Sequence, residues 1–116
     1  MRTLRFLAWS LLCLAALPAL ADDLTDQIRA GREKSRPCTT CHGLNGQRQG
    51  GEMPAIGGRD YFDLLYQMGR FRRADRFHPA MTVLLQTYDV ADMADVAAYF
   101  ASMDSTRLVR PGPYQP

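Results

Sequence analysis

Two cysteines and a histidine form the most distinctive chemical pattern in the sequence. Cys38 and Cys41 are separated by two residues, and His42 follows the second cysteine directly. At this spacing the two thiols lie about one helical turn apart, so each can add across a vinyl group of the same porphyrin. The adjacent histidine can then bind the iron as an axial ligand. The spacing Cys-x-x-Cys-His therefore predicts the covalent attachment site of one c-type haem.

The N-terminal segment predicts export. Arg2 and Arg5 precede an apolar run over residues 6–17, and residues 18–21 end in a pattern of small residues. This arrangement is typical of a signal peptide that is cleaved after Ala21. A retained membrane anchor is the alternative, but the run is shorter than the roughly 20 residues that span a bilayer. We therefore expect a periplasmic protein with no stable membrane insertion once the signal is removed.

The sequence predicts one small domain between two terminal segments. A third interpretation of the N-terminal segment, lipid attachment at Cys13, fits poorly because Leu12 precedes this cysteine rather than Gly or Ala. The expected organisation is a signal peptide over residues 1–21, a single domain over 22–104 and a proline-rich tail over 105–116.

Charge and cysteine content narrow the function further. The predicted signal carries two of the 14 Lys and Arg residues and no acidic residue, so the mature chain has twelve charges of each sign. The mature chain therefore has no excess of positive charge, which is the main property that would favour binding to nucleic acids. A disulfide between Cys38 and Cys41 would close too short a loop to stabilise much. Disulfide exchange is the alternative use of this pair, but such a pair usually begins a helix after a strand, and no strand is predicted.

Local patterns predict helices and irregular connections. Asp23 can cap the first helix, and Pro37 should end it. Gly31 either weakens that helix or allows another helix backbone to approach closely. Helices are expected over residues 22–36, 60–69 and 89–103, with irregular segments over 43–58 and 71–86.

The last helix is the clearest prediction. Asp89 can cap its start, with Asp92 at the capping-box position. Its buried face should comprise Met93, Val96, Ala97 and Phe100, and the inward side of the second helix should comprise Tyr61, Leu64, Leu65 and Met68.

The whole mature chain resembles a class I cytochrome c of the small bacterial single-domain type, and is similar to one half of the dihaem cytochrome c4 proteins. The matching residues are 38–43, the Pro-Ala-Ile-Gly-Gly run at 54–58, Met81 and residues 92–102. The resemblance implies an all-α fold of three to five helices around one covalent haem c, with the first and last helices crossing. It also implies that the Pro54 carbonyl accepts a hydrogen bond from His42 and orients that ligand.

The sixth iron ligand has several candidates. Methionines that fall on predicted helices are more often core residues, and these are Met68, Met93 and Met103. Met53 lies too near the attachment motif for the backbone to pass round the haem. Met81 lies in an irregular segment where the family's distal ligand is found, so it is the preferred candidate. His78 is the alternative, although it is more simply explained as an exposed loop imidazole, and two histidine ligands would lower the potential.

These features predict a periplasmic one-electron carrier rather than an enzyme, with redox proteins of the periplasm or the inner-membrane respiratory chain as partners. The alternatives are a dedicated haem subunit of a periplasmic dehydrogenase, oxidising for example a sulfur compound or an alcohol, and a haem enzyme or gas sensor with an open distal site. The arginines at positions 70, 72, 73 and 76 allow three interpretations, namely a docking patch, partners of the haem propionates or a solvated face.

Overall fold

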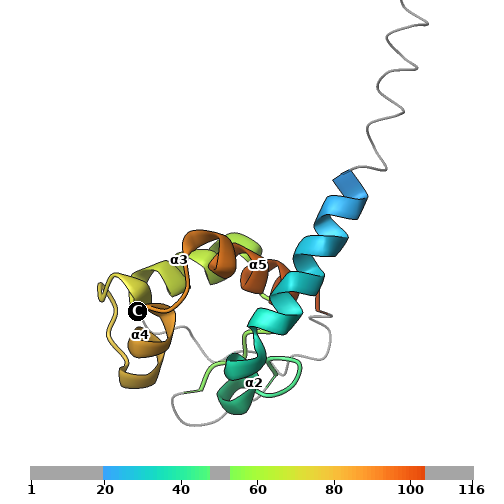
Figure 1. Cartoon of the computed structure of the whole chain (residues 1–116). Coiled ribbons are helices and arrows are strands. Elements are labelled where there is room, and N and C mark those ends of the chain that lie inside the picture. Colours follow the sequence, from blue (N-terminus) through green and yellow to red (C-terminus); the bar gives the residue numbers. More distant parts are fainter. Residues whose placement is uncertain (1–19, 48–52, 104–116) are drawn as a thin grey trace, which may run out of the picture.

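The computed structural model describes residues 20–47 and 53–103, and every regular element among them is a helix (Figure 1). A first helix runs through residues 20–34 and is followed by α2 (Arg36–His42), α3 (Tyr61–Arg72), α4 (Pro79–Leu85) and α5 (Val90–Ala101). The all-α prediction is therefore confirmed. The predicted tail and residues 1–19 of the predicted signal peptide lie outside the described residues.

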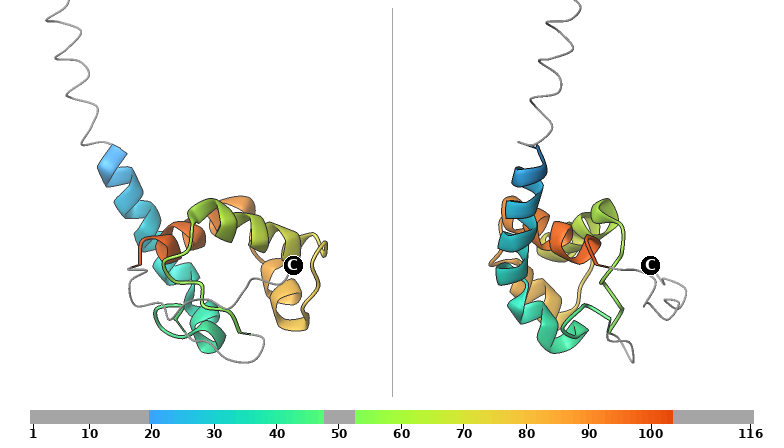
Figure 2. Two further views of the ribbon diagram at one scale, coloured as in Figure 1. Left: turned by 180° about the vertical axis from the view of Figure 1, so that it is seen from behind. Right: turned by 90° about the vertical axis from the view of Figure 1, so that its right-hand side faces the viewer.

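Helices α3 and α5 pack against each other, and α4 packs against α3. Helices α2 and α4 lie on the same side of the α3 and α5 pair, as the front and back views show (Figures 1 and 2). The C-terminal part of the first helix, around Gly31, crosses α5. No helix among the described residues combines the length and apolar character needed to cross a membrane.

Gly31 lies at the crossing between the first helix and α5. A Cβ atom at this position would come within 1.9 Å of the Asp95 carbonyl oxygen and 2.8 Å of the Tyr99 Cβ atom. Any side chain here would therefore push the two helices apart. Of the two roles predicted for this glycine, the close approach of another helix backbone is the one observed.

The core consists of two adjoining clusters of buried side chains. One comprises Leu64, Val96, Ala97 and Phe100, and the other comprises Phe71, Leu85 and Met93. The buried face predicted for the last helix is confirmed. On α3, by contrast, only one of the four predicted inward residues is fully buried, while Tyr61, Leu65 and Met68 are partly buried against the clusters.

The first helix differs from its prediction at both ends. It already includes residue 20, so Asp23 lies inside the helix and does not cap it. Leu20 and Ala21 are good helix formers and extend the helix on its N-terminal side. At the other end the helix breaks at Ser35, and Pro37 lies in the first turn of α2 instead of ending the first helix. Proline is tolerated there because the first turn of a helix does not use its own N–H groups.

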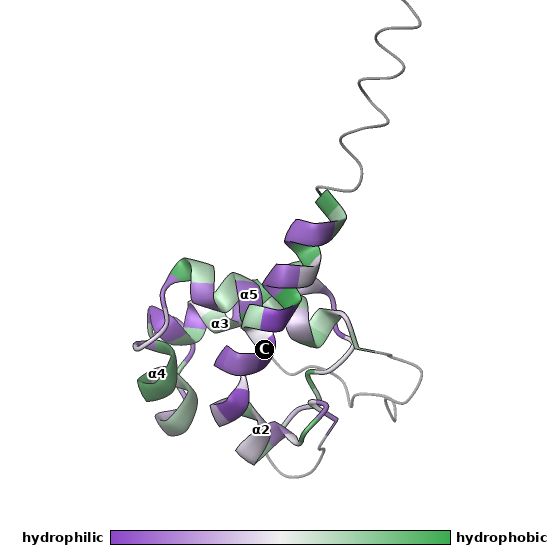
Figure 3. Cartoon of the chain, turned by 45° about the vertical axis from the view of Figure 1, so that its right-hand side comes forward, coloured by the Kyte–Doolittle hydropathy of each residue, from purple (hydrophilic) through white to green (hydrophobic). Residues whose placement is uncertain are grey.

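The prediction of an irregular segment over residues 71–86 was wrong except for residues 73–78 and 86. Helix α3 continues to Arg72, and residues Pro79–Leu85 form α4. The signal for α4 is the pair His78-Pro79, since His78 caps the helix and proline has the backbone angle of a first helical residue. Figure 3 shows that α4 is one of the most apolar elements, although Val83 on it is 69% exposed.

Candidate haem site

The two cysteines lie on α2, half-buried and not joined in a disulfide. Cys38 packs against the cluster around Leu64 and Phe100. Its burial raises the pKa of the thiol to about 11. A protein that exchanges disulfides needs a thiolate and therefore a lowered pKa. The environment of Cys38 consequently argues against the disulfide-exchange alternative and places a neutral sulfur next to the core.

His42 is the last residue of α2, and its side chain is buried. Its Nδ1 atom lies 2.8 Å from the carbonyl oxygen of Pro54, which is the contact that the resemblance implies. A carbonyl oxygen only accepts hydrogen bonds, so this partner assigns the proton to Nδ1. The lone pair is then left on Nε2, the ring nitrogen that can bind a metal.

The loop that carries Pro54 is held by backbone contacts with the loop after α2 and with α5. The backbone N–H groups of Ile56 and Gly57 donate to the Gly46 carbonyl at 2.7 and 2.9 Å, and Gly58 N–H donates to the Phe100 carbonyl at 2.7 Å. A Cβ on Gly57 would lie 2.0 Å from the Asn45 carbonyl oxygen. Among the described residues, these glycines are therefore explained by close contact between backbones.

Met81 lies on α4, near His42 in the folded chain. Its side chain is partly buried and packs against the cluster of Phe71, Leu85 and Met93. Met68 on α3 resembles Met81 in being partly buried against the core, whereas Met93 is buried within the core and Met103 packs against it just after α5. The predicted core role of the helical methionines is thus observed.

His78 is not the exposed loop imidazole that we expected. It is half-buried and occupies the N-cap position of α4. Its Nδ1 atom accepts a hydrogen bond from the backbone N–H of Met81 at 3.4 Å. The imidazole therefore contacts the backbone of the preferred sixth ligand.

The four clustered arginines all make contacts within the chain. Arg72 Nε donates to the Tyr88 carbonyl oxygen at 2.8 Å, and Arg73 Nε donates to Asp75 at 2.8 Å. The other two guanidinium groups lie over aromatic rings, Arg70 at 5.9 Å from the centre of Tyr66 and Arg76 at 4.6 Å from the centre of Phe71. These contacts favour the interpretation of a solvated face that also stabilises the end of α3.

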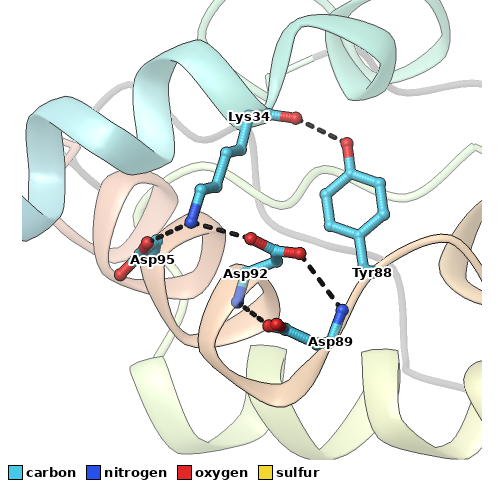
Figure 4. A network of polar contacts seen from close by, with 5 residues as sticks. All are labelled: Lys34, Tyr88, Asp89, Asp92 and Asp95. Atoms are coloured by element: carbon cyan, nitrogen blue, oxygen red, sulfur yellow. Dashed lines mark hydrogen bonds and ion pairs between the residues drawn. The ribbon is translucent and has the colours of Figure 1, made fainter.

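A polar network joins the first helix to the start of α5 (Figure 4). The Lys34 ammonium lies 2.7 Å from Asp92 and 2.6 Å from Asp95. Hydrogen bonds to these carboxylates raise the pKa of Lys34. The pKa of Asp92 is lowered, mainly by the hydrogen bond that it accepts from Lys34. Asp89 and Asp92 form the predicted capping box.

Tyr88 adds a second connection in the same network. Its hydroxyl donates to the Lys34 carbonyl oxygen at 2.6 Å, at the junction between the first helix and α2. Burial, followed by the neighbouring Cys38 and Asp92, raises the pKa of this phenol. Neither Tyr88 nor Lys34 can be recognised as part of the site from the sequence, because the two residues are 54 positions apart and belong to no motif.

The chain was also compared with known proteins. No family model matches the sequence. It is 38% identical over 93 residues to cytochrome c4 from Pseudomonas aeruginosa, with 80% of this chain and 46% of that protein covered. It is 34% identical over 71 residues to cytochrome c-552 from Acidithiobacillus ferridurans, with 61% of this chain and 30% of that protein covered. This chain is a class I c-type cytochrome.

A solved structure supports the same assignment. Cytochrome c4 from Acidithiobacillus ferrooxidans, whose structure is described as supporting a complex-induced tuning of electron transfer, superposes with a TM-score of 0.62 at 28% identity. The match covers 66% of this cytochrome and 50% of that chain. The cytochrome thus spans about half the length of the cytochrome c4 proteins that it matches, and is similar to one half of them.

Class membership implies a covalently bound c-type haem, and the described residues suit that group. Two thiols occupy one turn of α2, and a buried imidazole with its lone pair on Nε2 follows them directly. A thioether sulfur is available on α4, which lies on the same side of the fold (Figure 1). The two cysteines would hold the porphyrin, and His42 and Met81 would hold its iron.

Proposed function

We propose that this cytochrome is a periplasmic one-electron carrier. Cys38 and Cys41 attach one haem c, and His42 and Met81 are the axial ligands of its iron. The observation that carries this proposal is the pairing of the buried His42 with the Pro54 carbonyl, 2.8 Å from Nδ1. That pairing leaves Nε2 as the ligand atom and fixes the orientation of the ring beside two unpaired thiols.

When bound, the haem supplies a one-electron couple, and the protein supplies ligation, a low-dielectric surrounding and an orientation. The hydrogen bond to the Pro54 carbonyl would orient the His42 ring toward the iron. Met81 offers a thioether sulfur, which favours the reduced state and raises the potential relative to a second imidazole. Because His42 and Met81 would both hold the iron, no substrate would reach it. The cytochrome accordingly transfers electrons without being an enzyme.

We further propose that residues 1–21 are removed during export and that the mature chain works with redox proteins of the periplasm or the inner membrane. The small-residue pattern before Asp22 supports the cleavage site. Attachment of haem through thioethers requires reduced, unpaired thiols, and both cysteines are unpaired in the structure.

Size-exclusion chromatography of the natively purified protein distinguishes a free carrier from a tightly bound dehydrogenase subunit.

The ligands are tested by visible spectroscopy of protein matured where haem is attached. The wild-type ferric protein is expected to be low-spin, with the weak far-red band of methionine-bound iron. Met81→Ala should lose this band and bind carbon monoxide rapidly when reduced, because the sixth position opens. Met68→Ala is the matched control, since Met68 is also partly buried against the core but lies on α3. It should retain the band.

Three other spectra would contradict the proposal in different ways. A low-spin wild-type spectrum without the far-red band would contradict Met81 as the ligand and favour His78. A high-spin spectrum would indicate an open iron and therefore an enzyme or a sensor. Protein that remains colourless after maturation would contradict haem attachment at Cys38 and Cys41.

A further inference from the structure

The N-terminal end of α4 is closed by the side chains of two residues. His78 Nδ1 accepts from the Met81 N–H at 3.4 Å. In return, the His78 N–H donates to Thr82 Oγ1 at 3.1 Å, and the Thr82 N–H donates to the His78 carbonyl at 2.8 Å. Pro79 has no N–H group to satisfy. The side chains of His78 and Thr82 therefore both satisfy backbone N–H groups at the start of this helix, and Thr82 is buried.

This cap contacts the backbone of Met81 itself. Helix α4 has only seven residues, so it is too short to be stable through its own hydrogen bonds. It is held by packing of Leu85 and Thr82 on one side and by the cap at its start. Because Met81 is the third residue of the helix, loosening the first turn moves the backbone from which its thioether projects.

The partner of the His78 ring also determines what its second nitrogen can do. A neutral imidazole that accepts a hydrogen bond at Nδ1 carries its proton on Nε2. That nitrogen then has no lone pair for a metal. His42 has the opposite arrangement, because its Nδ1 faces a carbonyl oxygen. In these contacts the two histidines thus differ in which ring nitrogen keeps a lone pair, and that of His78 faces the helix backbone.

We propose that His78 is a positioning residue, which holds Met81 in place for iron ligation through the α4 cap and does not bind the iron itself. The proposal rests on the proposed function, specifically on Met81 as the sixth ligand. In the sequence, His78 is the alternative to Met81 as the sixth iron ligand. The proposal gives this histidine a different role. It also predicts that the strength of the cap controls how easily an added ligand displaces Met81.

Titration of the ferric, haem-loaded protein with imidazole tests this role. Loss of a helix N-cap has a typical cost that corresponds to about a fivefold change in an equilibrium constant. His78→Ala should therefore bind imidazole about fivefold more tightly than wild type, and its far-red band should weaken. His78→Asn should restore wild-type affinity to within about twofold, because asparagine is among the best N-cap residues.

Two further variants separate positioning from general stability. Thr82→Val keeps the buried volume and removes the other acceptor of the cap, so it should tighten imidazole binding by about twofold. Asp89→Ala is the matched control, since it removes the N-cap of α5 instead of α4. It should lower the melting temperature and leave the imidazole affinity unchanged.

The proposal is overturned if His78→Ala binds imidazole as wild type does, or if His78→Asn behaves like His78→Ala. An equal effect of Asp89→Ala would also overturn it, because any loss of stability would then act in the same way. Failure of the proposed function is recognised separately. If the wild-type protein has no far-red band, Met81 is not the ligand, whereas a wild-type band with an unresponsive His78→Ala contradicts the positioning role alone.

Discussion

His42 and His78 each lie at the end of a short helix, yet the structure prepares them for different tasks. His42 ends α2 and is paired with a carbonyl oxygen, whereas His78 begins α4 and is paired with a backbone N–H. A helix end exposes N–H groups at its start and carbonyl groups at its finish. A histidine at a helix start therefore tends to serve as an acceptor. The position of a histidine in its helix thus decides which partner it meets and which ring nitrogen keeps a lone pair.

The regions around these histidines are also held in different ways. The α2 side is fixed by contacts between residues far apart in sequence, including Tyr88 to the Lys34 carbonyl and Gly58 to the Phe100 carbonyl. At the start of α4, the cap contacts that His78 makes with Met81 and Thr82 join residues three and four positions apart. Disturbing the α2 side should therefore affect global stability. Disturbing the α4 cap should mainly affect ligation.

Gly31→Ala should give the largest effect on the α2 side. The new Cβ would overlap the Asp95 carbonyl oxygen at 1.9 Å, so the first helix must shift away from α5. We expect a loss of about 3 kcal/mol in the free energy of unfolding, at the upper end for overpacked sites. Chemical denaturation of the haem-loaded protein measures it. Ala30→Gly on the same helix is the control, and a loss no larger than in that variant would contradict the close crossing.

Tyr88→Phe should give the next largest effect. It removes the hydroxyl that donates to the Lys34 carbonyl at 2.6 Å and preserves the packing of the ring. The expected loss in the free energy of unfolding is about 1–2 kcal/mol, because a part-buried carbonyl loses its donor. The far-red band should be unchanged. Tyr66→Phe is the control on the exposed face of α3, and an equal loss there would show that the hydroxyl of Tyr88 has no special role.

Ala74→Gly tests the connection that leads into α4. Ala74 has a φ of 61°, in the left-handed region where a side chain costs about 1–2 kcal/mol. Glycine removes that strain but adds entropy to the unfolded chain, so the net gain should be about 0.5–1 kcal/mol. Thermal unfolding measures this gain. Ala80→Gly, within α4, should instead destabilise, and the same sign in both variants would contradict the assigned strain.

The pH dependence of the Lys34 and Asp92 pair should give the smallest effect. The pKa of Asp92 is lowered in the folded protein, so its contribution is present above its unfolded pKa of about 3.9 and is lost as the pH falls below that value. The pKa of Lys34 is raised, so its contribution is lost only as the pH rises above 10.5. The difference in melting temperature between wild type and Lys34→Met should be constant near neutral pH and shrink below about pH 4.

Arg32→Met is the matched variant for this titration, because Arg32 is an exposed cation on the same helix. The difference in melting temperature between Arg32→Met and wild type should not shrink below about pH 4. If the Lys34→Met difference does not change between pH 6 and pH 3, the pair contributes nothing to acid stability.

Much of the site was predictable because its residues are neighbours in sequence. The attachment motif, the Asp89 capping box and the buried face of α5 each depend on spacings within one or two helical turns, and the structure contains all three patterns. The same local reasoning failed over residues 71–86. There, helix α4 depends on its His78 cap and on burial of Leu85 against α3 and α5 residues, and only the cap is visible in the sequence.

The sequence by itself indicated the all-α class and the helix that carries the core, and it predicts Cys38 and Cys41 as the attachment residues. The all-α class was implied by the resemblance to class I cytochromes c, whereas the core helix and the cysteine motif are visible in the spacing of residues along the chain. Only the tertiary structure decided that Gly31 supports a crossing, that Tyr88 reaches Lys34 and that the two histidines have opposite partners. Crossings and long-range hydrogen bonds exist only once the chain has packed. The local partner of His78 likewise depends on a helix that packing stabilises.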